Sequence, residues 1–221
     1  MSKKVAIVLA GSGVQDGSEI YETTLTLLRL DQLGIKYRCF APDIPQHEVV
    51  DHWRGEATSE TRNVLVEAAR VARGEISPLD ELSASDFDAV IVPGGFGVAK
   101  NLSDFAEAGS QMVINEVLRE VLSEFHDARK PIGLICIAPV LVPRLFGAGI
   151  AVTIGNDPAV AGAISAMGGL HRTCPVDDIV VDFEHRIVTT PAYMVANSIS
   201  EAAEGIFKLV ERISEMADIK M

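Results

Sequence analysis

The sequence has few cysteines, few aromatic residues and no long apolar run. Its three cysteines, Cys39, Cys136 and Cys174, are widely spaced and contain no CxxC pair, which argues against a disulfide framework and a structural zinc site. We expect free thiols in a reducing compartment. The apolar run at residues 5–10 is too short for a signal peptide, and no later run could span a membrane. These absences predict a cytoplasmic protein with no membrane partner.

Basic residues are also scarce. Lys and Arg number 19 against 31 Asp and Glu, so the formal net charge is -12. Such an acidic surface repels phosphate backbones, and nucleic acid is therefore not an expected partner. The rest of the composition, 48% apolar and 23% charged over 221 residues, is typical of a globular chain with a sizeable core. We expect a single domain over residues 1–221.

Short apolar runs alternate with helical patterns along the chain. The runs at residues 5–10, 89–92 and 132–137 are typical of strands buried on both faces of a parallel sheet. The first helix is predicted to open with a capping box of Asp16 and Glu19 and to end at Gly34. The helices are predicted at residues 17–33, 58–73, 110–129 and 198–216. This alternation predicts an α/β three-layer sandwich with an open, mostly parallel, flavodoxin-like sheet.

Two segments depart from that alternation. Residues 171–190 have β-branched runs around a polar turn at 182–186, which predicts an antiparallel hairpin added to the sheet. Residues 43–60 are polar, contain the only tryptophan, Trp53, and are predicted to form an excursion over the site. This excursion also contains Asp43, His47, Asp51 and His52. Their spacing matches no standard set of metal ligands, so no metal site is predicted there.

A glycine-rich turn, AGSGVQDG at residues 10–17, follows the first strand. Its spacing, Gly11-x-Gly13-x-x-x-Gly17, is one residue too long for the GxGxxG dinucleotide motif. We favour the interpretation that the glycines permit a tight strand-to-helix turn. Nucleotide binding is the least favoured function, and no cofactor is predicted.

Cys136 stands between an apolar strand and the start of a helix, in KPIGLICIAPVLVPRLF at residues 130–146. A sharp turn there would expose a nucleophile above the carboxyl edge of the sheet, where amides and the helix dipole favour a thiolate. A buried inert thiol is the alternative, and the turn alone does not decide between them. The preceding strand ends in PGGFG, whose adjacent glycines allow close approach of backbone N–H groups. Gly95 and Ile137 are therefore predicted to form an oxyanion hole, with Gly94 as a further candidate.

These segments together resemble the class I glutamine amidotransferase-like superfamily that includes PfpI. The strings that carry this resemblance are PGGFGVAKNLS, ICIAP and GSEIYETTLTLLRLDQLGI. Within the superfamily, CFAPD, GEATSETRNVLVEAARVARGEI, CPVDDIVVD and IVTTPAYM are similar to the ElbB group. Members of that group are bacterial proteins once tied to isoprenoid biosynthesis and described as glyoxalases. The resemblance covers nearly the whole chain and implies a homodimer.

The resemblance also implies a catalytic glutamate on the first helix. The position of this glutamate in the family, counted back from Gly34, corresponds to Glu22. Glu19 lies on the same helix face and is the alternative. Burial and a nearby like charge should raise the pKa of this carboxyl, which suits a general acid and base. Relatives often place a histidine near the nucleophile. Here the register puts Thr173 or Cys174 at that position, and His171 is a weaker candidate.

The function that the resemblance implies is a glyoxalase-type lyase that needs neither glutathione nor metal. Cys136 would form a hemithioacetal with glyoxal or a related small aldehyde, and the product would be glycolate. Protein deglycase activity is a variant of the same chemistry. The alternative is a non-catalytic redox-sensing or stress-linked binding protein with a reactive cysteine.

Overall fold

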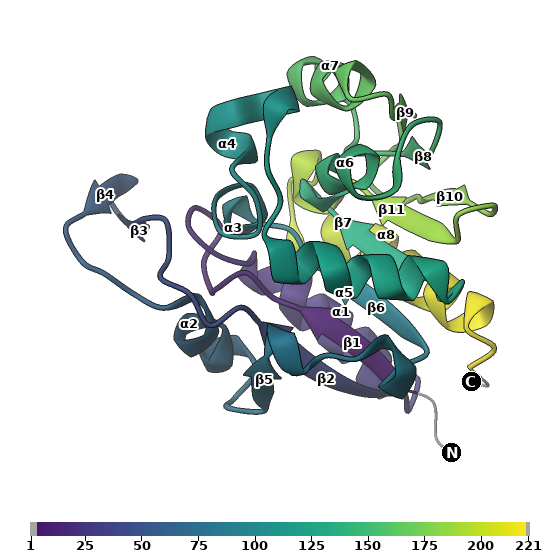
Figure 1. Cartoon of the computed structure of the whole chain (residues 1–221), viewed down its shortest axis with the longest axis horizontal. Helices are drawn as coiled ribbons and strands as arrows, with labels where there is room; N and C mark the ends of the chain where they lie inside the picture. The colour runs from purple at the N-terminus through teal and green to yellow at the C-terminus, as the bar shows by residue number, and fades with distance from the viewer. Residues whose placement is uncertain (1–3, 220–221) are drawn as a thin grey trace.

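A seven-stranded sheet forms the centre of the computed structural model, which describes residues 4–219 (Figure 1). Its order is β10-β11-β7-β6-β1-β2-β5, and every neighbouring pair is parallel except β10 with β11. In that order the strands are Val180–Asp182, Ile187–Thr190, Ile132–Ile135, Ala89–Val92, Lys4–Val8, Lys36–Ala41 and Ile76–Pro78. The predicted α/β class with a mostly parallel sheet is confirmed.

Helices cover both faces of this sheet. Helices α1 (Ile20–Gln32) and α8 (Ile199–Met216) pack side by side on one face, and α5 (Glu116–Asp127) covers the other (Figure 1). Helix α2 (Val64–Val71) packs beside β2 and β5. The shorter helices are α3 (Phe96–Lys100), α4 (Phe105–Ala108), α6 (Val142–Phe146) and α7 (Pro158–Ala166). The 3-10 turns are η1 (Leu79–Glu81), η2 (Ala84–Asp86), η3 (Gly109–Gln111), η4 (Ala138–Leu141) and η5 (Ala192–Met194).

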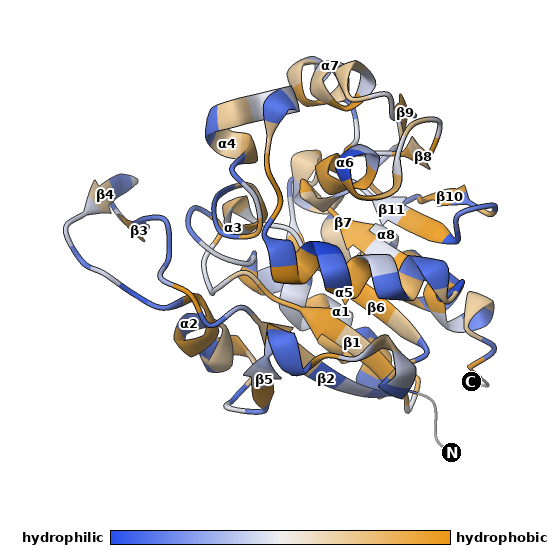
Figure 2. Ribbon diagram, viewed as in Figure 1, coloured by the Kyte–Doolittle hydropathy of each residue, from blue (hydrophilic) through white to orange (hydrophobic). Residues whose placement is uncertain are grey.

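The core lies where apolar strands meet apolar helix faces. All of β6, β7 and β11 is buried. Strands β6 and β7 are mainly orange in Figure 2, whereas α5 changes between orange and blue along its length. Helix α5 turns Leu118, Leu122 and Phe125 into the core, as its amphipathic pattern predicts. Gly133 lets α8 approach β7 closely, because a Cβ there would lie 2.9 Å from Cδ2 of Leu209. Burial of this apolar surface is the main stabilising contribution to the fold.

Three predicted helix boundaries were wrong. Helix α1 begins at Ile20 with Glu19 as its N-cap, because Asp16 instead accepts a hydrogen bond from the Val50 N–H at 2.8 Å. Helix α2 begins only at Val64, where the Asn63 side chain caps it, and residue 58 belongs to a strand. Helix α5 begins at Glu116 rather than 110 because Asn115 caps it. The last predicted helix agrees with α8 apart from Ser198, which is its N-cap.

The predicted hairpin is confirmed in part. Strands β10 and β11 pair antiparallel around the turn at 183–186. However, β11 is also a parallel member of the main sheet beside β7, so only β10 is an antiparallel addition. His171 lies outside this hairpin, in a small parallel pair of strands, β8 (Ala151–Val152) with β9 (Leu170–His171).

The predicted excursion at residues 43–60 belongs to an arm, residues 43–63, that contains a hairpin. Its strands, β3 (Val49–Asp51) and β4 (Glu56–Thr58), project away from the sheet (Figure 1). Trp53 lies at the hairpin turn and is 86% exposed, so it does not cap a pocket. The buried Asn101 side chain ties the arm to the body. Its Nδ2 donates to the carbonyls of Ala10 and Asp16 at 2.9 Å each, and its Oδ1 accepts from the His47 N–H at 2.9 Å.

Replacement of Asn101 by Asp should destabilise the protein by on the order of 3 kcal/mol, because two donors become acceptors that face buried carbonyls. The measurement is urea unfolding at pH 7. Asn156→Asp, at an exposed position, makes the same chemical change and should cost no more than about 0.5 kcal/mol. Equal stability of the two variants would contradict the role assigned to Asn101.

Candidate active site

Several chain segments meet at the carboxyl edge of the sheet. The strands β1, β6, β7 and β11 are mutually parallel, so the segments that follow them reach the same edge. After β1 the chain proceeds to β2 and β5 and then returns to β6 on the other side of β1. Ligand sites of open α/β sheets lie at such a reversal of strand order. This edge is therefore the candidate active site.

Cys136 occupies a strained turn directly after β7. Its φ is +61°, a left-handed conformation that costs a non-glycine residue about 1–3 kcal/mol. The turn is held by the Cys136 N–H, which donates to the Thr190 carbonyl at 3.0 Å, and by the 3-10 turn η4 that follows. The side chain is buried, with 8% of the residue exposed. The geometry is that of the sharp turn expected for a nucleophile.

Glu22 is the carboxyl partner of this thiol. It is fully buried on the first turn of α1 and forms a side-chain hydrogen bond with Cys136. Its Oε2 accepts from the Gly94 N–H at 2.9 Å, and its Oε1 accepts from the Tyr193 N–H at 3.1 Å. The carboxyl group is thus held from the segments after β6 and β11 while it faces the thiol.

Two glycines make this approach sterically feasible. A Cβ on Gly94 would lie 2.3 Å from Cβ of Cys136 and 2.6 Å from Oε2 of Glu22. Gly95 has φ of +96°, and a Cβ there would lie 2.3 Å from the Gly17 carbonyl oxygen. The backbone N–H groups of Gly95 and Ile137 both form hydrogen bonds to the sulfur of Cys136. The five predicted positions Glu22, Gly94, Gly95, Cys136 and Ile137 therefore lie together.

The electrostatics of the pair are dominated by burial. Burial raises the pKa of Glu22 to about 8, and the charge of Glu19 adds to the rise. This is the direction predicted from the sequence. Burial, followed by the charge of Glu22, also raises the pKa of the Cys136 thiol well above its usual range, while the amides of Gly95 and Ile137 lower it. Burial thus outweighs the amides that were expected to favour a thiolate, and of the two alternatives left open the buried thiol is favoured.

Two further candidates lie outside the thiol–carboxyl contact. Glu19 is the N-cap of α1, and its Oε2 accepts from the Glu22 N–H at 2.6 Å. The Nε2 of His171 accepts from the Ile154 N–H at 3.4 Å, and no hydrogen bond joins His171 to Cys136 within residues 4–219. The other two thiols are buried, and burial raises the pKa of Cys39 to about 12 and that of Cys174 to about 11.

Tyr193 is the site residue that the sequence analysis missed. It follows Ala192, which has φ of +42°, in the turn η5 just beyond β11. The tyrosine ring lies 6.1 Å from that of Tyr21, between centroids. A usable signal was present in the string IVTTPAYM, since a segment that leaves a parallel strand reaches the same sheet edge as Cys136.

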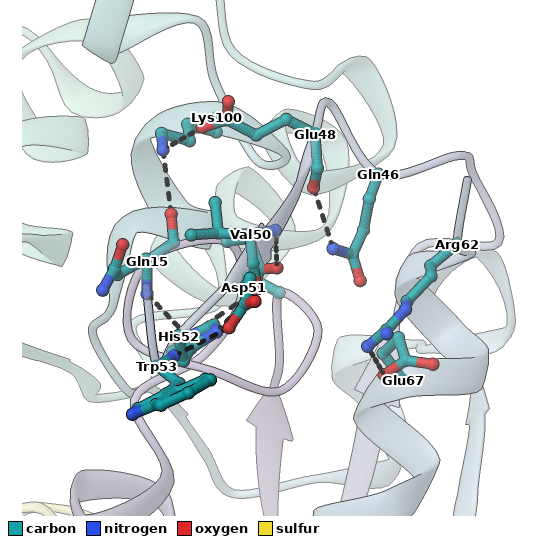
Figure 3. Close-up of polar contacts among 12 residues, drawn as sticks. Gln15, Gln46, Glu48, Val50, Asp51, His52, Trp53, Arg62, Glu67 and Lys100 are labelled. Atoms are coloured by element: carbon teal, nitrogen blue, oxygen red, sulfur yellow. Dashed lines mark hydrogen bonds and ion pairs between the residues drawn. The ribbon is translucent and has the colours of Figure 1, made fainter. Parts of the chain in front are cut away.

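Three amides of the glycine turn at residues 11–17 donate hydrogen bonds within the protein. The Gly17 N–H donates to the Gly13 carbonyl at 2.7 Å, and the Gly13 N–H donates to that of Ser18 at 2.8 Å. Figure 3 shows the Gln15 N–H directed at Nε2 of His52 in the arm, at 3.2 Å. These three amides are therefore not free to bind a phosphate, which supports the tight-turn interpretation. The arm therefore contacts this turn, and within residues 4–219 no hydrogen bond joins the arm to Cys136 or Glu22.

No group of three or more His, Cys, Asp or Glu side chains among residues 4–219 is arranged to hold a metal ion. Within the same residues, no helix is both long and apolar enough to cross a membrane.

The chain belongs to the DJ-1/PfpI family, whose model matches residues 3–153. A rat protein named ES1 protein homolog, mitochondrial, is 44% identical, and the match covers 96% of this chain and 84% of the relative. The human glutamine amidotransferase-like class 1 domain-containing protein 3, mitochondrial, is also 44% identical, with 96% and 83% covered.

Solved structures agree with this assignment. The isoprenoid biosynthesis protein with amidotransferase-like domain from Ehrlichia chaffeensis is 39% identical, with a TM-score of 0.91 over 97% of this chain and 99% of that one. DJ-1beta of Drosophila melanogaster, at 20% identity, has a TM-score of 0.57 over 99% of this chain and 97% of its own and shares the fold. The superfamily recognised in the sequence is confirmed at the level of the family.

The raised pKa of Glu22 predicts a pH-dependent stability. A carboxyl whose pKa rises on folding, here from 4.5 to about 8, contributes stability that is complete below pH 4.5 and is lost as pH rises through 8. Glu22→Gln removes this dependence but adds a constant cost, because the amide can accept only one of the two backbone hydrogen bonds. As the pH rises from 5 to 8, the free energy of unfolding of the variant should increase by on the order of 3 kcal/mol relative to that of the unmodified protein.

The measurement is urea unfolding of both proteins at several pH values. Glu184→Gln, at an exposed position in the β10–β11 turn, is the control for the charge change and should show no such gain. A constant difference between Glu22→Gln and the unmodified protein across this pH range would show that Glu22 is ionised throughout.

Proposed function

We propose that the protein is a glyoxalase-type lyase that converts glyoxal, or a related small reactive dicarbonyl, to a hydroxy acid without glutathione. The observation that supports this most directly is the hydrogen bond between the buried Glu22 carboxyl and the Cys136 thiol, beneath two amides. The thiol can add to a carbonyl, the carboxyl can move protons, and the amides can hold an oxyanion. An isomerisation between adjacent carbons needs these three elements.

The reaction begins with the form of the pair that has lost one proton. The Glu22 carboxylate accepts the Cys136 proton as the sulfur attacks one carbonyl carbon of glyoxal. The carbonyl oxygen becomes an alkoxide near the Gly95 and Ile137 amides and takes up that proton. The product of this step is a hemithioacetal. The attacked carbon now bears the sulfur, one hydroxyl group and its original hydrogen, and it remains bonded to the second carbonyl carbon.

The rearrangement follows on the same two carbons. Glu22 removes the proton from the sulfur-bearing carbon, which leaves an enediolate. The hydroxyl proton on that carbon passes to the oxygen of the neighbouring carbon, and Glu22 returns its proton to the neighbouring carbon itself. The hemithioacetal thereby becomes a thioester of glycolic acid, with no net oxidation. Water hydrolyses the thioester, which releases glycolate and regenerates the thiol. Since Cys136 is only 8% exposed, a free small aldehyde suits this site better than a glycated protein, so deglycase activity is the secondary proposal.

The redox-sensing alternative has less support from the site. Sensor cysteines react as exposed thiolates of low pKa. Burial and Glu22 act on Cys136 in the opposite direction. A thiol that ionises only by proton transfer within the pair suits a catalytic nucleophile better than a general peroxide sensor.

Within the family, we place the chain in the ElbB group on the strings that span its length. A homodimer and a cytoplasmic location complete this proposal, although the rat and human relatives are named as mitochondrial.

Exposed apolar side chains close to the site offer a surface that a second copy would cover: Val14, Ile20, Tyr21 and Phe96. Light scattering of the pure protein should give twice the 23.7 kDa chain mass, and cell fractionation should recover it with cytoplasmic proteins. A monomer, or recovery in another compartment, would overturn the corresponding part.

Replacement of Cys136 by Ala should reduce glyoxal consumption to the uncatalysed rate, because no hemithioacetal can form. The measurement is the loss of glyoxal and the appearance of glycolate by chromatography, without glutathione. Cys39→Ala is the matched control, since that buried thiol lies in β2, and it should retain full turnover. Turnover by Cys136→Ala at the unmodified rate would refute the mechanism.

A further inference from the structure

Two buried carboxyl groups lie one helical turn apart at the start of α1. Glu19 is 7% exposed and Glu22 is fully buried. Within residues 4–219 neither of them takes part in an ion pair, and the pair between α1 and α8, Arg29 with Glu211, lies two turns further along the helix. Two like charges in such a place are costly, and the cost falls when one of the groups takes up a proton.

The surroundings decide which group takes up the proton. Glu19 has the N-cap position, where its carboxylate accepts a hydrogen bond from the Glu22 N–H, and the amides of Tyr21 and Ile20 also lower its pKa. The positive end of the helix dipole also favours a charge there. Although burial raises the pKa of Glu19 as well, these hydrogen bonds oppose the rise. Glu22 lies deeper and bears the larger effect of burial, so the proton belongs mainly to Glu22.

The titratable groups around Glu22 come from a few elements. Glu19 faces it from α1, Cys136 from the turn after β7, and Tyr193 from η5. The segment after β6 contributes only the Gly94 amide. Tyr193 is a phenol whose own pKa is raised, by burial first and then by Glu19. Among these described neighbours, Glu19 is therefore the group whose charge raises the pKa of Glu22.

A glutamate is also an uncommon choice for its capping role. Asn, Asp, Ser and Thr are the preferred N-cap residues because their short side chains reach the free amides of the first turn. Capping alone does not explain a glutamate at position 19. Its carboxyl group is buried one helical turn before the carboxyl that faces Cys136.

We propose that Glu19 is a positioning residue that holds the proton on Glu22 and so sets the pH range in which Cys136 reacts. This inference rests on the proton exchange between Glu22 and Cys136 that the proposed function uses, but it needs no aldehyde. With Glu19 charged, the pair loses its proton only in mildly alkaline solution. At neutral pH most sites hold a thiol beside a protonated carboxyl, and the nucleophile is formed in a minority of molecules.

The test is the pH dependence of Cys136 alkylation by iodoacetamide, between pH 5 and pH 10. Peptide mapping separates Cys136 from Cys39 and Cys174. Glu19→Gln keeps an oxygen that can cap the helix but removes the charge. Its alkylation midpoint should fall by about one pH unit, which is a roughly tenfold faster reaction below the midpoint.

Glu19→Asp keeps both the charge and a good capping group, so its midpoint should stay near that of the unmodified protein. Glu184→Gln, which removes an exposed charge far along the chain, should leave the midpoint unchanged. An unchanged midpoint in Glu19→Gln would overturn the proposal. So would equal shifts in Glu19→Gln and Glu19→Asp, because these would reflect altered capping geometry rather than charge.

Circular dichroism melting separates this effect from a loss of folding, since a merely destabilised variant would expose all three cysteines together. The two proposals fail independently. Absence of glyoxal turnover in the unmodified protein would refute the lyase function and leave the alkylation result standing. An unshifted alkylation profile with active turnover would refute only the role of Glu19.

Discussion

The contact on which the site depends is the buried Glu22 carboxyl, held by the amides of Gly94 and Tyr193 and bonded to Cys136. Neither amide would be in place without the parallel sheet, because they belong to segments that leave β6 and β11 at the same edge. The contact also requires glycine at position 94, where a Cβ would overlap both partners. The parallel sheet, the glycine at position 94 and the geometry of the site therefore depend on one another.

This contact also determines how the thiol becomes reactive. Helix starts and amides usually lower the pKa of a cysteine, and the amides of Gly95 and Ile137 act in that direction here. Burial and the neighbouring carboxyl act against them and prevail. The sulfur is therefore inert until its proton moves to Glu22. A resting thiol is less exposed to oxidation than a thiolate, so the arrangement protects the nucleophile between encounters with substrate.

The sequence allowed the sheet and much of the site to be predicted, for identifiable physical reasons. Apolar runs reveal strands buried on both faces, and PGGFG and ICIAP mark the turns that follow two of them. The string IVTTPAYM indicates only that Tyr193 reaches this sheet edge, and its contact with Glu22 joins segments far apart in the sequence. The start of α1 shows the same limit, since Asp16 and Glu19 are both acceptable caps and only the contact of Asp16 with Val50 decides between them.

Glu19 and Glu22 show how the same type of side chain acquires different roles at two positions of one helix. At the N-cap, three backbone amides and the helix dipole stabilise the charged form of Glu19. One turn later the amides of the helix are engaged, and only groups from other strands can reach Glu22. The first carboxyl is suited to hold a charge and the second to exchange a proton. Pairs of acids separated in this way divide the tasks of stabiliser and acid in many active sites, and here the division follows from the first turn of α1.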